Sequence, residues 1–183
     1  MTVTVTPDTF QFVSFDAAAI QRIAESLVAA LGLAAYSVAI EVDETTPLAR
    51  ITVEPGDPIS VRAESGAFED TRQPRQLSET ATATALGRVL LRARDRLIGG
   101  FGEAPPDKDL SLAQVAAWEA YSVGRLERLG VPVHQQRWRY NFRNRHGFHN
   151  TSDGAFDRLW SSDGLTWGEL DEISRAGAVA PAV

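Results

Sequence analysis

Three short segments of alternating apolar and polar residues lie between two long segments with helical spacing, and this order restricts the folds open to the chain. The first helical segment, 17–31, follows Asp16, a favourable cap residue, and stops at Gly32. The second spans 77–98. The alternating segments, which have the period of a β-strand, are 36–42, 50–54 and 59–64. A strong turn signal at 55–58 predicts a hairpin between the last two.

The rest of the chain predicts further helices joined by loops. Segment 65–76 is polar and is interrupted by Pro74, so it is expected to be a loop. Capping boxes precede two of the later helices: Ser111 with Gln114, and Thr166 with Glu169. These helices are expected at about 111–129, 153–161 and 167–175. At the ends of the chain, 1–9 is expected to be frayed or a short edge strand and 176–183 to be loose.

This order of elements predicts the α+β class rather than a regular alternation of strands and helices. We expect a small antiparallel or mixed sheet of three to four strands, packed against two or three long helices, with short C-terminal helices. We also expect a single domain over 1–183, since the length suits one domain and no linker composition interrupts the chain.

Composition excludes several classes of protein. The chain has no cysteine, which removes disulfides, thiolate metal sites and cysteine nucleophiles. Its net charge of −6 disfavours nucleic-acid binding as a property of the whole chain. No signal-peptide pattern and no long apolar segment is found, so a cytoplasmic location without membrane contact is expected.

Segment 134–149 differs from everything else in the chain. It holds all three histidines and four arginines and no acid, so it carries +4 while the remainder carries −10. Between 137 and 148 arginines occupy mainly odd positions and aromatic residues mainly even ones. In an extended chain these two sets would lie on opposite faces, which predicts a strand with an aromatic face and a row of guanidinium groups.

Two interpretations of this arginine row remain open. In the structural one, the arginines pair with Glu41, Glu54 and Glu64 on the predicted strands, or with the acidic residues that follow 150. In the functional one, guanidinium groups about 7 Å apart bind a phosphate or carboxylate, with the aromatic rings beside them. The candidate ligand-binding residues are Arg137, Arg139, Tyr140, Arg143, Arg145, His146 and His149.

A weaker hypothesis concerns metal binding or hydrolysis. His146 and His149 with Asp153 would supply two imidazoles and a carboxylate to a metal, or a general base at neutral pH. Their spacing matches no diagnostic motif, and the chain contains neither a P-loop nor a G-x-S-x-G motif. We therefore expect no catalytic residue, no resident metal and no cofactor.

The order of helix, strands and long helix over 16–98 resembles that of the minimal zincin-like metallopeptidase domain. In that family the long helix carries H-E-x-x-H. Here the corresponding residues are Ser78-Glu79-Thr80-Ala81-Thr82, which keep the glutamate but lack both histidines. The resemblance implies a degenerate domain that has lost its zinc and its peptidase activity.

The leading hypothesis from the sequence is a non-enzymatic cytosolic module. It would bind a protein partner or a small anionic ligand through the arginine and aromatic residues of 137–148. The alternatives are the degenerate zincin-like domain and a metal- or His-dependent hydrolase. The sequence leaves the identity of the ligand and the oligomeric state open.

Overall fold

The structure is a computed structural model that describes residues 2–178. It is an α+β protein with a mixed four-stranded sheet, a small two-stranded hairpin and six α-helices in that range, which confirms the predicted fold class. The chain divides between Arg94 and Asp95 into two compact units, described separately below. This boundary falls inside helix α2 (Glu79–Ile98) rather than at a linker, and the single domain expected over 1–183 stays a prediction.

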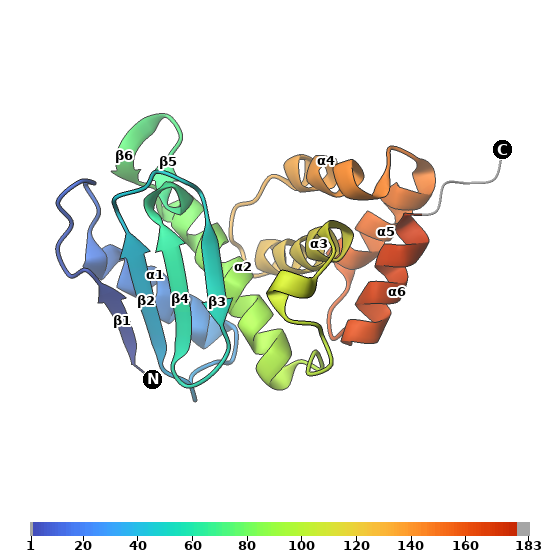
Figure 1. Cartoon of the computed structure of the whole chain (residues 1–183), viewed down its shortest axis with the longest axis horizontal. Coiled ribbons are helices and arrows are strands. Elements are labelled where there is room, and N and C mark those ends of the chain that lie inside the picture. Colours follow the sequence, from blue (N-terminus) through green and yellow to red (C-terminus); the bar gives the residue numbers. More distant parts are fainter. Residues whose placement is uncertain (1, 179–183) are drawn as a thin grey trace. The chain divides into compact units, whose positions relative to one another are not determined.

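The first unit is built on the four-stranded sheet (Figure 1). Its strands are β1 (Val3–Thr6), β2 (Val38–Asp43), β3 (Ile51–Glu54) and β4 (Ile59–Glu64). The spatial order is β1-β2-β4-β3, with β1, β2 and β4 parallel and β3 antiparallel to β4. The β3–β4 pairing confirms the predicted hairpin, and β1 confirms the edge-strand alternative for the N-terminal segment.

Helix α1 (Ala17–Ala30) connects β1 to β2, and a crossover of this length allows the two strands to run parallel. The Asp16 carboxylate accepts a hydrogen bond from the Ala18 backbone N–H, as the cap residue is expected to do. The buried face of the helix contains Ile20, Ala24 and Val28. Figure 1 shows α1 behind the sheet, which therefore has one apolar face and one polar face.

Segment 65–76 is not the loop that its polarity predicted. It forms a short 3₁₀ turn, η1 (Ser65–Ala67), and a small hairpin of β5 (Glu69–Asp70) and β6 (Gln73–Leu77). Phe68 is fully buried between these elements and its carbonyl accepts from the Ser78 backbone N–H, which anchors the segment. Pro74 is compatible with β6 because the register pairs Gln73 and Leu77 but not Pro74 with β5.

The second unit is helical. Its helices are α3 (Leu112–Arg128), α4 (Gln135–His146), α5 (Asn150–Ser161) and α6 (Trp167–Gly177), after a short turn, η2 (Asp107–Asp109). Both capping boxes form as predicted. Trp118 and Tyr121 of α3 are buried in a core of aromatic side chains that also includes Phe101 and Phe142. In the segment expected to be loose, Ala176 and Gly177 belong to α6, and 179–183 lie outside the described residues.

Segment 137–148, predicted to be a strand, lies mostly in the helix α4. Trp138 is half-buried and Phe142 and His146 are buried, and these three residues follow one another at intervals of four. A spacing of four puts them on one face of a helix. The remaining aromatic residues at even positions, Tyr140 and Phe148, are exposed. The even-numbered aromatic residues therefore do not share one face, since Tyr140 lies on another side of the helix and Phe148 follows its end. The alternation interpreted as a strand was a coincidence of composition.

Candidate binding surfaces

Three residues of the predicted site are exposed on α4, and together with Phe148, which follows the helix and was not a predicted site residue, we call them the α4 face. It consists of Arg137, Tyr140, Arg145 and Phe148. The side chains of Tyr140 and Phe148 are 58% and 62% exposed, and their rings meet edge to face with centroids 5.8 Å apart. Within 2–178, neither Arg137 nor Arg145 has a hydrogen-bond or ion-pair partner. These exposed residues thus include two arginines without a partner in that range and two aromatic rings in contact with each other.

The other two arginines of the predicted row face α5 instead of solvent. Arg143 donates two hydrogen bonds to the Asp153 carboxylate, at 2.7 and 2.6 Å. Arg139 pairs with Asp157, and its guanidinium group lies over the Phe156 ring at 4.5 Å. The hydrogen bond from Arg143 lowers the pKa of the Asp153 carboxyl below its ordinary value. These two arginines therefore connect α4 to α5, as the structural interpretation predicted for the acidic residues after 150.

His146 is buried in the helical core. Its ring stacks on Phe142 with centroids 3.7 Å apart, and its Nε2 lies 2.9 Å from the Ser174 Oγ. Its Nδ1 lies 3.2 Å from the Phe142 carbonyl oxygen. A carbonyl only accepts, so Nδ1 carries the proton and Nε2 accepts from the Ser174 hydroxyl. Burial lowers the pKa of His146, which keeps the ring neutral near pH 7.

The remaining members of the proposed metal or hydrolase site are also engaged within the protein. His149 is the cap residue of α5, and its ring Nδ1 accepts from the Ser152 backbone N–H. Asp153 is held by Arg143. Among residues 2–178, no group of three or more His, Asp or Glu side chains is placed to hold a metal ion. The structure therefore does not bring His146, His149 and Asp153 together as one site.

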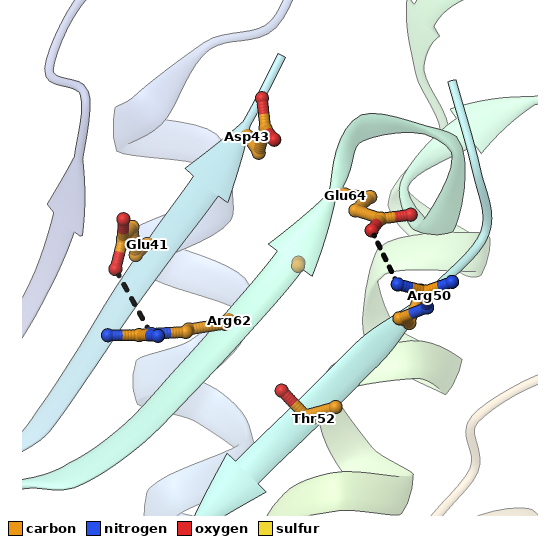
Figure 2. Close-up of a pocket in the computed structure, with 7 residues that line it drawn as sticks. Glu41, Asp43, Arg50, Thr52, Arg62 and Glu64 are labelled. Atoms are coloured by element: carbon orange, nitrogen blue, oxygen red, sulfur yellow. Dashed lines mark ion pairs between the residues drawn. The ribbon is translucent and has the colours of Figure 1, made fainter. Parts of the chain in front are cut away.

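A second charged surface, not predicted as a site, lies on the polar face of the sheet (Figure 2). It is a shallow pocket of about 270 Å³. Arg62 of β4 pairs with Glu41 of β2 at 3.3 Å, and Arg50 pairs with Glu64 at 3.3 Å. The structural interpretation offered these glutamates as candidate partners for the arginines of 137–145, but Glu41 and Glu64 pair with Arg62 and Arg50 instead. Since each guanidinium already has a carboxylate, the pocket offers no uncompensated cation to a ligand.

Ser78 and Thr82 stand at the two positions where the zincin-like family has histidines, and both have structural roles at the start of α2. Ser78 accepts a hydrogen bond from the Ala81 backbone N–H at the start of α2, and the Thr82 side chain is buried. Glu79, between them, is exposed. The degenerate zincin-like domain stays a prediction that rests on the order of elements.

Helices long and apolar enough to cross a membrane are absent from the described part of the chain. Comparisons with protein-family models, with curated proteins and with solved structures find no match. The function therefore has to be inferred from the surfaces themselves.

Proposed function

We propose that the protein is a non-enzymatic binding module that docks an acidic surface of a partner protein on its α4 face. The observation that carries this proposal is that the α4 face holds two guanidinium groups without a partner in 2–178, those of Arg137 and Arg145, together with the exposed rings of Tyr140 and Phe148. Arginine and tyrosine are enriched among the residues that dominate protein–protein binding energy. The proposal keeps the cytoplasmic location expected from the sequence.

The geometry favours a protein partner over the small anion considered from the sequence. Arg137 and Arg145 are eight residues apart, which is about 12 Å along a helix axis. One phosphate or carboxylate does not span that distance, whereas a row of acidic side chains on a partner does. The arginines between them, Arg139 and Arg143, are already paired with Asp157 and Asp153. A small anion would therefore meet a single free guanidinium at each end of a convex helix.

Electrostatics supports the same choice of partner. The chain carries −6 overall, so the α4 face is a local positive surface on an acidic protein. An acidic partner surface would be attracted to this face and repelled elsewhere, which would orient the encounter. A nucleic acid would meet the same repulsion along its whole length, because its phosphates are evenly spaced.

The test is a titration of the protein into a fluorescein-labelled synthetic peptide of alternating glutamate and leucine, followed by fluorescence anisotropy. We expect binding at low salt that weakens as salt is added. The double variant Arg137→Glu/Arg145→Glu should bind at least about tenfold more weakly, which corresponds to about 1.4 kcal/mol. Its fold should be unaffected, because neither side chain has a partner in the described structure.

The matched control is Arg22→Glu/Arg72→Glu, which makes the same change in net charge at exposed arginines of the first unit. At high salt its affinity for the peptide should equal that of the unchanged protein, and at low salt its affinity should be only slightly lower. Equal loss in the two double variants would reduce the effect to net charge and contradict the proposal. Displacement of the peptide by millimolar inorganic phosphate, or by a single-stranded oligonucleotide, would also contradict the proposal and would identify a small anion or a nucleic acid as the ligand.

A further inference from the structure

A separate feature of the first unit points to a small-molecule site. Because β1, β2 and β4 are parallel, their carboxyl ends lie along the same edge of the sheet. The segments that follow these strands are 7–16, 44–50 and 65–78. In open sheets with parallel strands, ligands bind in the crevice outside the carboxyl ends. This edge is therefore the first place in the unit to search for a ligand.

Hydrogen bonds join the three segments to one another in pairs. The Glu44 carboxylate accepts from the Phe12 backbone N–H at 2.6 Å, which joins the first segment to the second. The Ser65 hydroxyl donates to the Thr46 carbonyl at 3.0 Å and joins the second to the third. The Ser14 N–H donates to the Arg75 carbonyl at 2.8 Å and closes the ring. These hydrogen bonds hold the three segments in place around the space between them.

Between them lies a pocket of about 340 Å³, which we call the edge pocket. Its volume is within the range of small-molecule sites. Part of its wall is apolar and comes from Phe12, Pro47 and Pro74, and the ionisable groups in the wall are Glu44, Glu69 and Arg75. Phe12 is 59% exposed, although it is held by a backbone hydrogen bond beside the buried Val13. A ligand in the pocket would cover part of this ring.

The two glutamates keep hydrogen-bonding capacity for a donor. Glu44 uses one carboxylate oxygen, Oε2, for the backbone N–H groups of Gln11 and Phe12. Glu69 Oε1 lies 3.2 Å from the Ser65 hydroxyl, whose single proton is shared between this oxygen and the nearer Thr46 carbonyl. The second oxygen of each carboxylate has no hydrogen-bond partner within 2–178. An ammonium group, with three donors and a positive charge, matches such a pair of acceptors, and the face of Phe12 adds attraction for a cation.

Arg75 supplies the opposite charge. Its backbone has φ 65°, and it is the one non-glycine residue at positive φ in the described range. This conformation disfavours a residue with a Cβ, so glycine or asparagine would suit the position better. The guanidinium group has no partner among the described residues, while the carbonyl of the same residue is held by Ser14. The arginine in the wall of the pocket therefore occupies a position whose backbone conformation disfavours it.

We infer that the edge pocket binds a small zwitterion of the amino-acid class. The ammonium group would lie against the free oxygens of Glu44 and Glu69, the carboxylate would pair with Arg75, and an apolar side chain would cover Phe12. This site belongs to the first unit and does not depend on the α4 face of the second.

The test is a thermal-shift screen of the unchanged protein against the twenty amino acids, followed by calorimetric titration of those that raise the melting temperature. Each such amino acid is compared with its amide, which lacks the carboxylate, and with its N-acetyl derivative, which lacks the ammonium. We expect at least one amino acid to bind and both derivatives to bind at least about tenfold more weakly. Absence of binding by all twenty, or equal binding by a derivative, would overturn the inference.

Two variants separate binding from folding. Arg75→Gly relieves the positive φ, so it should leave the melting temperature unchanged or raised while it weakens amino-acid binding at least about tenfold. Glu69→Gln keeps the size of the side chain and an oxygen near Ser65 but removes the charge, and should weaken binding in the same way. Arg72→Ala, at an exposed arginine outside the pocket, should bind normally. Normal binding by Arg75→Gly would contradict the assignment, whatever the outcome of the α4 experiment.

Discussion

A single ion pair, Asp95 with Arg125, supplies the most deeply buried charges of the second unit. The two side chains are 2% and 5% exposed, and two hydrogen bonds of 2.7 Å join the guanidinium to the carboxylate. Trp118 donates its indole N–H to the same carboxylate, and the guanidinium lies over the Tyr121 ring at 3.8 Å. All three hydrogen bonds to the Asp95 carboxylate are buried, so a partner that loses its bond cannot be hydrated instead. The cluster is therefore sensitive to the loss of any one member.

We predict that Asp95→Ala lowers the free energy of unfolding by about 3–5 kcal/mol. The reason is that Arg125 would remain buried without a counter-charge, and Trp118 would lose its acceptor. The measurement is urea unfolding followed by tryptophan fluorescence. Arg175→Ala is the control, since it breaks an exposed pair with Asp171 on α6 and should cost no more than about 0.5 kcal/mol.

A double variant tests the cause. Asp95→Leu/Arg125→Met removes both charges and should recover much of the stability lost in Asp95→Ala, because replacing a buried pair by apolar residues is often neutral. If the double variant were as unstable as Asp95→Ala, packing rather than the uncompensated charge would be responsible.

At the scale of the elements, α3 and α5 approach so closely that one position admits no side chain. A Cβ atom added to Gly124 of α3 would lie 2.1 Å from the Trp160 carbonyl oxygen of α5. Arg128, one turn further along α3, donates hydrogen bonds to the carbonyls of Trp160 and Ser162 at 2.5 and 2.6 Å. The last turn of α5 is therefore held against α3 by direct contact between main chains and by Arg128.

We predict that Gly124→Ala destabilises the protein by about 1–3 kcal/mol, because two backbones would have to separate. The contrasting substitution is Gly154→Ala in α5, where no atom lies within 4 Å of the added Cβ. It should stabilise by about 0.5–1 kcal/mol through helix propensity alone. The chemical change is identical, so the urea midpoints of the two variants should move in opposite directions. A neutral or stabilising effect of Gly124→Ala would show that the α3–α5 contact is looser than described.

Over the whole molecule, the features predictable from the sequence were those with a local cause. The Asp16 cap and the two capping boxes are patterns within four residues, and each forms as predicted. The prediction of a strand at α4 was wrong because the aromatic residues of this segment fit a period of two as well as a spacing of four. Only the burial of Phe142 against other helices distinguishes the two patterns, and burial is not a local property.

Both candidate surfaces depend on contacts that no local pattern contains. Arg139 and Arg143 are neutralised by residues ten to eighteen positions away, and among the described residues this leaves Arg137 and Arg145 as the two arginines of the row without a partner. The edge pocket joins Phe12 to Arg75 across three segments and exists because β1 pairs in parallel with β2. The sequence predicted a loop over 65–76 and contained no pattern that joined Arg75 to Phe12.

Stability of the whole protein should depend on pH through His146. Burial lowers its pKa in the folded state, whereas in the unfolded chain the pKa returns to about 6.5. Below pH 6.5 the unfolded chain therefore binds a proton that the folded protein resists. The contribution of the neutral ring is fully present above pH 6.5 and is lost as the pH falls toward the folded-state pKa.

We predict that the free energy of unfolding falls between pH 7 and pH 5 with a slope of at most about 1.4 kcal/mol per pH unit from this residue. In His146→Gln the protein should be less stable at pH 7, because the contacts with Phe142 and Ser174 change, but the slope should be smaller. His134→Gln, at an exposed histidine that caps α4 without a side-chain hydrogen bond, should keep the full slope. The Asp153 carboxyl does not interfere, since its pKa is lowered and it titrates below this window. Urea unfolding of the three proteins at half-unit steps of pH measures the slopes, and equal slopes for all three would exclude His146 as the residue responsible.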